Sequence, residues 1–480
     1  MFLKTKHPEG LWILAAVNIF YDFAFGAITS LLVLYATQKL QMPTSKAYDL
    51  SAVLFSLLFI LPLAGGYACE KLGYKMTGSM GFLTSLVGVC ILVIPSPAML
   101  YLGIACFVSG NALSTPTCYA MVGMHYDEHS PLRNSGYTLF YLLFNIGFFV
   151  SLVSTGFISE LNFNLAFALG GICVLTALLI FILRFDRFAP VAGNSFAPQV
   201  SWSFSTRLLT LLGTVIFLSL ISLILLHHRD LNTIVFFLLA AGTSLGLLCS
   251  ALKQKDPVRR RKMLAFLILC IFSIAFWSLY ILEPSLVAVF ISQNVNRVIL
   301  GLNIPAASYY ALDPFFVITL GVFFTWLWQY LARKNKDPSL PTKFSASLLS
   351  MGLGYLIFAV GILCVSQHTY LVHSSWIVLG YLFLASAELL ISPIGLSMVG
   401  QLMPKGREAL GMGIWQVYVG FSGVIAAFLA NLAVVPQSGL PQTTNPVFLQ
   451  ALLKIGLGTF VIGLLMCCLI SKIRPLIQKN

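Results

Sequence analysis

The feature that most constrains this chain is a series of long apolar runs, each about as long as a helix that crosses a bilayer. Some twenty apolar residues are needed to span the hydrocarbon core. We count about fourteen such runs, which predict an all-α polytopic membrane protein with about 14 transmembrane helices. Their approximate extents are 10–37, 50–70, 77–95, 98–122, 136–159, 163–184, 207–227, 232–252, 263–284, 312–333, 344–366, 374–402, 408–433 and 446–471.

Composition excludes several other classes of protein. Hydrophobic residues make up 59% of the chain and charged residues 9%, whereas charged residues form roughly 25% of a soluble domain. The net charge of +13 lies in short loops between the apolar runs, so it does not indicate a nucleic-acid partner. The first residues lead straight into an apolar run without a small-residue cleavage site, so we expect no signal peptide.

No pattern typical of catalysis or metal binding is present. We find no glycine-rich phosphate loop, no nucleophile–base arrangement and no cysteine spacing typical of a metal site or disulfide framework. We therefore expect a protein that is not an enzyme and that binds no metal or cofactor. The histidines fall in loops or at helix ends, and we expect them at the surface: His7, His125, His129, His227, His228, His368 and His373.

The distribution of Lys and Arg predicts the orientation in the membrane. With the N-terminus in the cytoplasm, all but five of the 28 Lys and Arg residues fall in cytoplasmic segments. Both termini are then cytoplasmic. The basic runs 253–262 and 332–343 are expected to face anionic lipid at the membrane surface. The five exceptions are Lys39, Lys46, Arg229, Arg297 and Lys454.

The runs divide along the chain as six, two and six. This predicts an N-terminal six-helix bundle over 1–184, a linker with two extra transmembrane helices over 185–262 and a C-terminal six-helix bundle over 263–480. Two such bundles favour a transporter that opens alternately to either side of the membrane around a site at the midplane. The two extra helices carry no intramembrane charge and are expected to be peripheral.

A carboxylate interrupts one of the apolar runs. Glu388 lies in the middle of 380–404, where a charged residue costs roughly 2.5–3.5 kcal/mol by insertion scales. Such groups face a bundle interior or a watered cavity, and they mark a path for substrate or ions. Asp22 and Asp313 also lie within apolar runs, whereas no Lys or Arg does. The expected interior is therefore acidic; the alternative is a protonated carboxyl that serves helix packing alone.

The loop GYACEKLGYK, residues 66–75, is similar to the loop G-x-x-x-D-R-x-G-R-R of major facilitator transporters. Glu70 stands for the Asp and Lys71 for the Arg. This carboxylate and base can pair across helix ends and hold the bundles in one state. The alternative is an ordinary solvated loop. The predicted gating loop comprises Gly66, Glu70, Lys71, Gly73 and Lys75.

Several separate stretches together resemble the proton-dependent oligopeptide transporters, the POT/PTR family of the major facilitator superfamily. The resemblance implies two six-helix bundles with two extra central helices, and secondary active import of di- or tripeptides by alternating access. It further implies proton coupling, a bacterial cytoplasmic (inner) membrane and a monomer. The stretches are HPEGLW (7–12), GNALSTPTCYAMVG (110–123), LRNSGYTLFYLLFNIGFF (132–149), ALDPFFVITLGVFFTWLW (311–328), KFSASLLSMGLGYLIF (343–358), AELLISPIGLSMV (387–399) and GMGIW (411–415).

Some positions agree with the family's site. The resemblance implies that Asn145 holds the peptide backbone, that Glu388 receives the peptide amino terminus and that Trp415 lines the pocket. Tyr141 and Ser392 are expected neighbours. The full set of expected substrate-binding residues is Asn145, Glu388, Trp415, Asp313, Tyr141, Ser392, Phe25 and Thr115.

Other positions depart from the family. Its helix-one E-x-x-E-R motif falls on Asn18, Tyr21 and Asp22, and its helix-four Lys falls on Thr115. The family's Arg that follows falls on Thr29, its tyrosine pair on Phe25 and Gly26, its helix-eight Asn on Asp313 and its helix-seven acid on Ile281. Glu283 follows two residues later, at or near the outer end of its helix. Proton-coupling candidates are therefore Asp22, Glu388 and Glu283.

Three functions stay open on the sequence. The first is proton-coupled import of peptides or peptide-like compounds by an altered route. The second is a uniporter or exporter of cationic amines, drugs or other metabolites, because an interior with three acids and no base favours cations. The third is a non-transporting peptide sensor. The gating loop together with Asn145, Glu388 and Trp415 favours transport over sensing.

Overall fold

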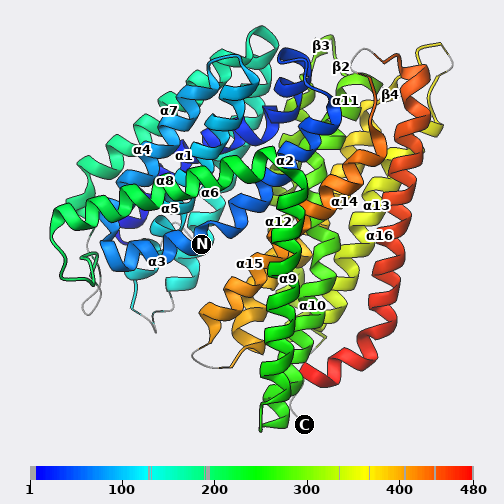
Figure 1. Cartoon of the computed structure of the whole chain (residues 1–480). Helices are drawn as coiled ribbons and strands as arrows, with labels where there is room; N and C mark the ends of the chain where they lie inside the picture. Colours follow the sequence, from blue (N-terminus) through cyan, green and yellow to red (C-terminus); the bar gives the residue numbers. More distant parts are fainter. Residues whose placement is uncertain are drawn as a thin grey trace. The chain divides into compact units, whose positions relative to one another are not determined.

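The computed structural model confirms the all-α fold class. Within the described residues, 14 helical segments are long and apolar enough to cross a membrane (Figure 1). The chain folds into two compact units, made of Met1–Met42 with Ile60–Arg229 and of Pro43–Phe59 with Asp230–Asn480. We name them unit 1 and unit 2. The structure describes residues 7–127, 130, 132–188, 190, 195–334, 336–366, 368–404, 407–436 and 439–477.

Unit 1 is built from helices alone in its described part. Its first span is prolonged by a π-helical turn, η2, and its last helix, α8, follows the linker after η3. The elements are α1 (Glu9–Leu34), η2 (Tyr35–Lys39), α3 (Pro62–Leu72), α4 (Tyr74–Leu92), α5 (Pro97–Met124), α6 (Leu132–Leu161), α7 (Phe163–Leu183), η3 (Phe185–Arg187) and α8 (Phe204–His227).

Unit 2 contains the remaining helices and two very small sheets. β1 (Val295–Asn296) pairs in parallel with β4 (Val372–His373), and β2 (Val298–Ile299) forms a hairpin with β3 (Leu302–Asn303). The helices are α2 (Thr44–Ile60), α9 (Arg229–Leu252), α10 (Pro257–Leu282), η4 (Glu283–Val287), α11 (Ala288–Asn294), η5 (Ala306–Ala311), α12 (Leu312–Arg333), α13 (Leu340–Leu363), α14 (Ser374–Leu402), α15 (Glu408–Ala430), η6 (Asn431–Ala433) and α16 (Pro441–Ile477).

Glycines let the helix backbones touch within each unit. In unit 1, a Cβ added at Gly88 of α4 would lie 2.7 Å from the carbonyl oxygen of Gly103 of α5. In unit 2, a Cβ added at Gly352 of α13 would lie 2.9 Å from the carbonyl oxygen of Gly456 of α16. Small residues of this kind allow close packing where lipid supplies no hydrophobic drive between helices. These seams form the rigid frame of each unit.

The segment Pro43–Phe59 of α2 packs in unit 2, although it lies early in the chain. Asn431 donates a 2.9 Å hydrogen bond to Asp49 Oδ1. A Cβ added at Gly423 of α15 would lie 2.1 Å from Ser56 Oγ, so α2 and α15 are in close contact. α2 ends at Ile60, directly before the Leu61–Pro62 turn that begins α3. The break in the helix therefore falls at the border between the two units.

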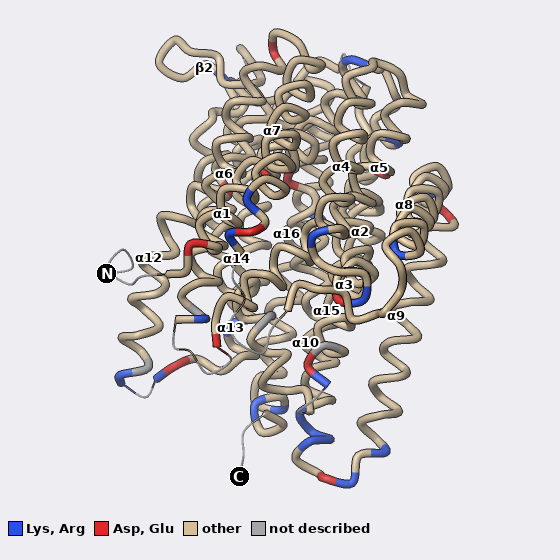
Figure 2. The backbone as a smooth tube through the Cα atoms, turned by 90° about the vertical axis from the view of Figure 1, so that its left-hand side faces the viewer, with Lys and Arg blue, Asp and Glu red and all other residues tan. Residues whose placement is uncertain are grey.

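The extra helices α8 and α9 are weakly buried. Only 22% of the most apolar window of each is buried inside the protein. α8 groups with unit 1 and α9 with unit 2, so the border between the units passes between Arg229 and Asp230. The predicted boundaries 1–184, 185–262 and 263–480 describe chain order and stay a prediction. In unit 2, Lys and Arg gather where α9 ends, where α10 begins and where α12 and α16 end (Figure 2).

Candidate functional site

Three buried carboxyl groups meet inside unit 2. Glu283 is 1% exposed, Asp313 is 2% exposed and Glu388 is 8% exposed. Asp313 interacts electrostatically with both of the other two. Within the described part of the chain no Lys or Arg is buried. The cluster is therefore acidic and has no buried cation to offset it.

Local structure explains how each carboxyl reaches the interior. Glu283 begins the π-helical turn η4, with Pro284 after it, and such turns often mark functional sites in membrane and soluble helices alike. Asp313 lies in the first turn of α12, where the helix dipole favours an acid. Glu388 lies midway along α14, which also contains Pro393.

The prediction that Glu283 lies at or near the outer end of its helix is wrong. The span runs from Pro257 to Asn294, so Glu283 lies well inside it. The predicted run ends at residue 284, whereas the helical segment continues beyond Pro284. Proline is tolerated here because a π-helical turn accommodates the backbone that it disturbs. The apolar residues 286–291 carry the span onward.

Asp313 and Glu388 share a hydrogen bond between their carboxyl groups. An ionised carboxylate can only accept, so one of the two must carry a proton in this arrangement. Glu283 differs, since neither of its carboxyl oxygens has a hydrogen-bond partner among the described residues. The cluster can therefore hold at least one proton, and Glu283 is positioned to bind another or to meet a cation.

Three buried tyrosines and the half-buried Tyr280 interact with the acids. Tyr280, Tyr310, Tyr355 and Tyr381 all interact electrostatically with Glu283. Tyr280 and Tyr310 hydrogen-bond each other, and the Tyr355 hydroxyl donates to the Leu279 carbonyl at 2.6 Å. Hydroxyl groups both donate and accept, so this shell can accommodate either protonation state of the acids.

These tyrosines were not predicted as site residues, although a spacing pattern in the sequence indicates two of them. Tyr280 precedes Glu283 by three residues in YILE, and Tyr310 precedes Asp313 by three in YALD. Residues three apart share a helix face, so each pair points the same way. The repeated Tyr-x-x-acid spacing was the available sign of a common environment.

The other predicted site residues of unit 2 line nearby stretches of α14 and α15. Trp415 is buried and packs against Gly395, where an added Cβ would lie 2.5 Å from the indole ring. Ser392 follows Glu388 by one turn, and its buried hydroxyl has no hydrogen-bond partner among the described residues. Trp277 Nε1 and Gln416 Oε1 are buried without a partner in the same described set. Trp277 and Gln416 are thus further candidates that the sequence did not reveal.

Unit 1 has a neutral polar interior with a single acid among its described buried residues. Asp22 is 4% exposed and accepts a hydrogen bond from Asn18 Nδ2. Asn111 Oδ1 accepts from the Tyr21 hydroxyl at 3.2 Å and from Thr115 Oγ1 at 2.7 Å. The Tyr21 hydroxyl also lies 3.0 Å from Ser85 Oγ. Tyr21, Asn111 and Thr115 are thus joined by hydrogen bonds between neutral groups.

The remaining predicted residues of unit 1 lie on α1 and α6. Asn145 is 6% exposed, and its Nδ2 donates to the Tyr141 carbonyl at 3.0 Å. The Tyr141 side chain is 41% exposed. The half-buried ring of Phe25 lies 5.8 Å from that of Phe148. The structure therefore brings Glu283, Asp313 and Glu388 together in unit 2, and places Asn145, Tyr141, Phe25 and Thr115 in unit 1.

The predicted gating loop is tied to the linker that precedes α8. Lys71 Nζ donates to Gln199 Oε1 at 3.0 Å, rather than to a carboxylate. The Gln199 backbone N–H donates to the Glu70 backbone carbonyl. Lys75 Nζ lies 4.0 Å from Asp186 Oδ1. Gly73 has a φ of 98°, which favours glycine at this turn. Gly66 has open space beside it. The action of this loop as a latch between bundles stays a prediction.

The prediction that the histidines are surface residues is wrong for two of them. His7 is 9% exposed and His125 is 3% exposed. His7 Nδ1 lies 2.8 Å from the Tyr126 hydroxyl, and His125 Nδ1 lies 2.6 Å from the Met121 carbonyl. The His-Pro-Glu-Gly motif thus docks on the end of α5. His227, His228, His368 and His373 are exposed, and His129 lies outside the described residues.

Known proteins resemble this chain along nearly its whole length. Dipeptide and tripeptide permease B of Photorhabdus luminescens is 26% identical over 480 residues, which cover 99% of this chain and 98% of the permease. Dipeptide and tripeptide permease A of Escherichia coli (strain K12) is 26% identical over 485 residues, which cover 99% and 94%. A crystal structure of peptide transporter POT in complex with sulfate has a TM-score of 0.84 at 23% identity, covering 98% of this chain and 96% of the other.

The structural match shows the fold. The sequence profile of the POT family matches residues 72–445, which is well over half of the chain. Together with the fourteen spans, this establishes a multi-pass membrane protein that is a transporter and not an enzyme. The chain belongs to the POT family.

Proposed function

We propose that this protein is a secondary active transporter that imports di- or tripeptides, or peptide-like compounds, by alternating access and couples this to protons by an altered route. The observation that carries the proposal is the cluster of Glu283, Asp313 and Glu388, which is buried and has no buried Lys or Arg among the described residues. The related permeases take dipeptides and tripeptides. The membrane is the bacterial inner membrane, with both termini cytoplasmic.

The chain is an atypical member of its family. Asn18, Tyr21 and Asp22 occupy the positions of the helix-one E-x-x-E-R motif, and Thr115 occupies that of the helix-four Lys. Removing one member of a buried ion network strands a charge at a cost of roughly 3–5 kcal/mol. Here the hydrogen bonds among Tyr21, Asn111 and Thr115 replace the charges together. Proton coupling therefore moves to the acids of unit 2.

The substrate amino terminus meets Glu388. An ammonium group supplies the cation that the described interior of unit 2 lacks, and the tyrosine hydroxyls supply further hydrogen bonds. Asn145, Trp415 and Ser392 act as further substrate-binding residues, together with Asp313, Tyr141, Phe25 and Thr115. Because no buried Lys or Arg in the described chain can receive a carboxylate, substrates with a blocked carboxyl terminus bind better than zwitterionic peptides.

Protons and substrate neutralise the same cluster. One ammonium group offsets one carboxylate, and protons on the other two leave no net charge. A site that holds an ammonium group but no proton keeps two buried negative charges, which is costly in the low dielectric of the membrane. The loaded, neutral site therefore reorients most easily. A proton that crosses about 100 mV contributes about 2.3 kcal/mol, which is roughly a fiftyfold concentration ratio at 1.36 kcal/mol per tenfold.

A second function is favoured by the same charge imbalance. Three acids without a buried cation in the described residues suit a cationic amine at least as well as a peptide. In that case the protein is a uniporter or exporter of cationic amines, drugs or other metabolites. The proton would then neutralise the empty site rather than accompany the substrate.

The experiment is uptake of labelled dialanine and of its carboxyl-amidated form into proteoliposomes, with and without an inward proton gradient. Accumulation that needs the gradient, with the amidated form taken up better, supports the proposal. Uptake of dialanine that merely equilibrates and is indifferent to pH makes the protein a uniporter. Uptake of amines without any uptake of dialanine favours the second function. Glu388→Gln, which keeps the size and removes the charge, should weaken uptake of both forms, because both present the same ammonium group to this residue.

A further inference from the structure

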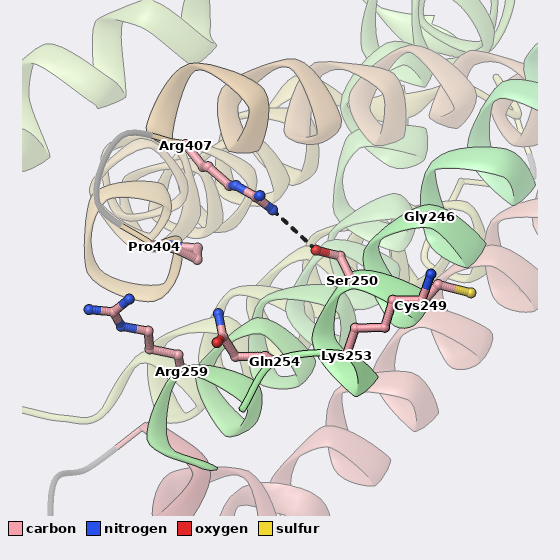
Figure 3. A pocket seen from close by; sticks show the side chains of 8 residues that line it. All are labelled: Gly246, Cys249, Ser250, Lys253, Gln254, Arg259, Pro404 and Arg407. Carbon is pink, nitrogen blue, oxygen red and sulfur yellow. Dashed lines mark hydrogen bonds between the residues drawn. The ribbon is translucent and has the colours of Figure 1, made fainter. Parts of the chain in front are cut away.

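A cavity lies in unit 2 where α9 ends, α10 begins and α15 starts (Figure 3). Its volume is about 620 Å³, enough for several non-hydrogen atoms of a ligand. It lies outside the acid cluster and is not used by the proposed function. The lining residues that matter here are Gly246, Ser250, Lys253, Gln254, Arg259 and Arg407.

The charge of this cavity is positive. Lys253, Arg259 and Arg407 line it, and none of the described lining residues is Asp or Glu. Asp256 lies next to this region, but it caps the start of α10 through a 2.9 Å bond from the Val258 amide. It also lies 3.3 Å from Arg259 Nε, which leaves the terminal nitrogens of that guanidinium for another partner.

Hydrogen-bond donors line this cavity from several sides (Figure 3). Arg407 Nη1 donates to Ser250 Oγ at 3.3 Å, which fixes the guanidinium over the end of α9 (Figure 3). The Gln254 amide lies between Arg259 and Ser250 in that view. Two guanidinium groups with an amide and a hydroxyl suit the oxygens of a phosphate, because a guanidinium presents paired N–H donors.

One face of α9 lines the cavity, and we call the open space along that face the groove. Gly246, Ser250 and Lys253 share one face of the helix, at spacings of four and three residues. A Cβ added at Gly246 would meet nothing within 4 Å, so space is open there. Leu245 is 62% exposed and Leu252 is 61% exposed, so an apolar surface borders the groove. At 1.5 Å per residue, the groove extends about 10 Å from Lys253 to Gly246.

We propose that this cavity binds an anionic phospholipid, with the phosphate held by Arg259, Arg407 and Lys253 and an acyl chain lying along α9 past Gly246. Basic side chains beside exposed apolar residues of the weakly buried α9 favour a lipid over a soluble phosphate. A soluble phosphate has no acyl chain to contact the apolar residues. Basic pockets between transmembrane helices suit anionic headgroups. The bound lipid joins the end of α9 to the start of α15 and so secures an extra helix against unit 2.

The test measures binding of phosphatidylglycerol to the full-length protein in detergent, by native mass spectrometry and by the rise in melting temperature. The comparison ligands are phosphatidylcholine and glycerol phosphate. One cation near a lipid surface changes affinity roughly fivefold, so Lys253→Gln, Arg259→Gln and Arg407→Gln together should weaken phosphatidylglycerol binding about a hundredfold. Phosphatidylcholine should bind at least tenfold more weakly than phosphatidylglycerol to the unchanged protein.

The matched control removes three charges from the same basic run 253–262 but outside the cavity lining, through Lys255→Gln, Arg260→Gln and Arg261→Gln. An equal loss in this control would overturn the proposal in favour of unspecific charge attraction. Stabilisation by glycerol phosphate equal to that by phosphatidylglycerol would also overturn it, since a soluble anion would then suffice.

A second variant keeps the proposal testable if the triple variant does not fold. Gly246→Leu fills the apolar groove and leaves every cation in place. It should weaken phosphatidylglycerol binding at least fivefold without changing the melting temperature of the lipid-free protein. Unchanged lipid binding in Gly246→Leu would contradict the placement of the acyl chain.

Discussion

Both units bury polar side chains, but only unit 1 supplies these side chains with hydrogen-bond partners throughout the network described above. In unit 1 the buried polar groups are joined into a neutral network, in which Tyr21, Asn111 and Thr115 satisfy one another and Asp22 bonds to Asn18. In unit 2 the carboxyl oxygens of Glu283 have no hydrogen-bond partner among the described residues. A satisfied network gives stability, whereas an unsatisfied buried acid is costly.

This difference indicates that the two interiors have different roles. Groups that are fully hydrogen-bonded gain little from a ligand, so the network of unit 1 serves as structure. Groups held without partners gain much from a proton or a cation, so the acids of unit 2 are the expected site of coupling. The four predictions below test this contrast, from the largest expected effect to the smallest.

The largest effect is expected from neutralising an acid in unit 2. Glu283→Gln should remove gradient-driven accumulation, a loss of roughly fiftyfold at about 100 mV, while exchange of substrate across the membrane continues. Asp22→Asn in unit 1 should change accumulation less than twofold, because Asn18 still bonds to the new amide. The measurement is the ratio of internal to external dipeptide in proteoliposomes. If Asp22→Asn lowered accumulation more than Glu283→Gln did, the proton-coupling site would lie in unit 1.

The second effect concerns stability of unit 1. A Cβ added at Gly10 would lie 1.9 Å from His125 Nε2, and this ring is buried at the end of α5. Gly10→Ala should therefore destabilise the protein by about 1–3 kcal/mol, without altering the gradient dependence of uptake. Thermal unfolding in detergent measures the loss of stability, and uptake by the folded fraction measures the gradient dependence. Gly246→Ala, where space is open, is the matched control.

The third effect is that of one hydrogen-bond donor. Tyr21→Phe removes the bonds to Asn111 and Ser85, and should cost about 0.5–1.5 kcal/mol. Thr115 still donates to Asn111, which keeps the cost at this level. Coupling should be unchanged, since the network holds no mobile proton in this view. Loss of accumulation in well-folded Tyr21→Phe would show that the network does more than stabilise.

The smallest effect is a pH dependence of stability. Burial lowers the pKa of His125, which lies just beyond the α5 span. The unfolded chain therefore takes up a proton at a higher pH than the folded one. Stability from this group is complete above about pH 6.5 and falls as the pH drops below that value. His125→Gln should flatten the melting temperature between pH 5 and 7; an unchanged slope would exclude His125 as its source.

Much of the fold follows from the sequence because bilayer thickness fixes the length of an apolar run. The number of spans and the buried position of Asp22, Asp313 and Glu388 were accordingly predictable. Glu283 was misplaced because its helix continues through Pro284 as a π-helical turn, which apolar periodicity does not encode.

Neighbour relations were harder to predict. The bonds from Tyr21 to Ser85 and Asn111 join residues 64 and 90 positions apart, so they depend on helix packing rather than on local pattern. The burial of His125 has the same origin, since Gly10 packs over its ring. Charge can be read from a sequence, but whether a charge is satisfied depends on the neighbours that packing supplies.

Because α2 packs against residues near the end of the chain, it is synthesised long before its partners. Asp49 bonds to Asn431, a residue 382 positions later in the chain. At about 5–20 residues per second, a ribosome takes roughly 20 to 80 seconds to make the partner of a helix that has already entered the membrane. During that interval the polar side chains of α2 must be hydrated or shielded by other molecules. The late C-terminal helices therefore complete a helix that was made almost first.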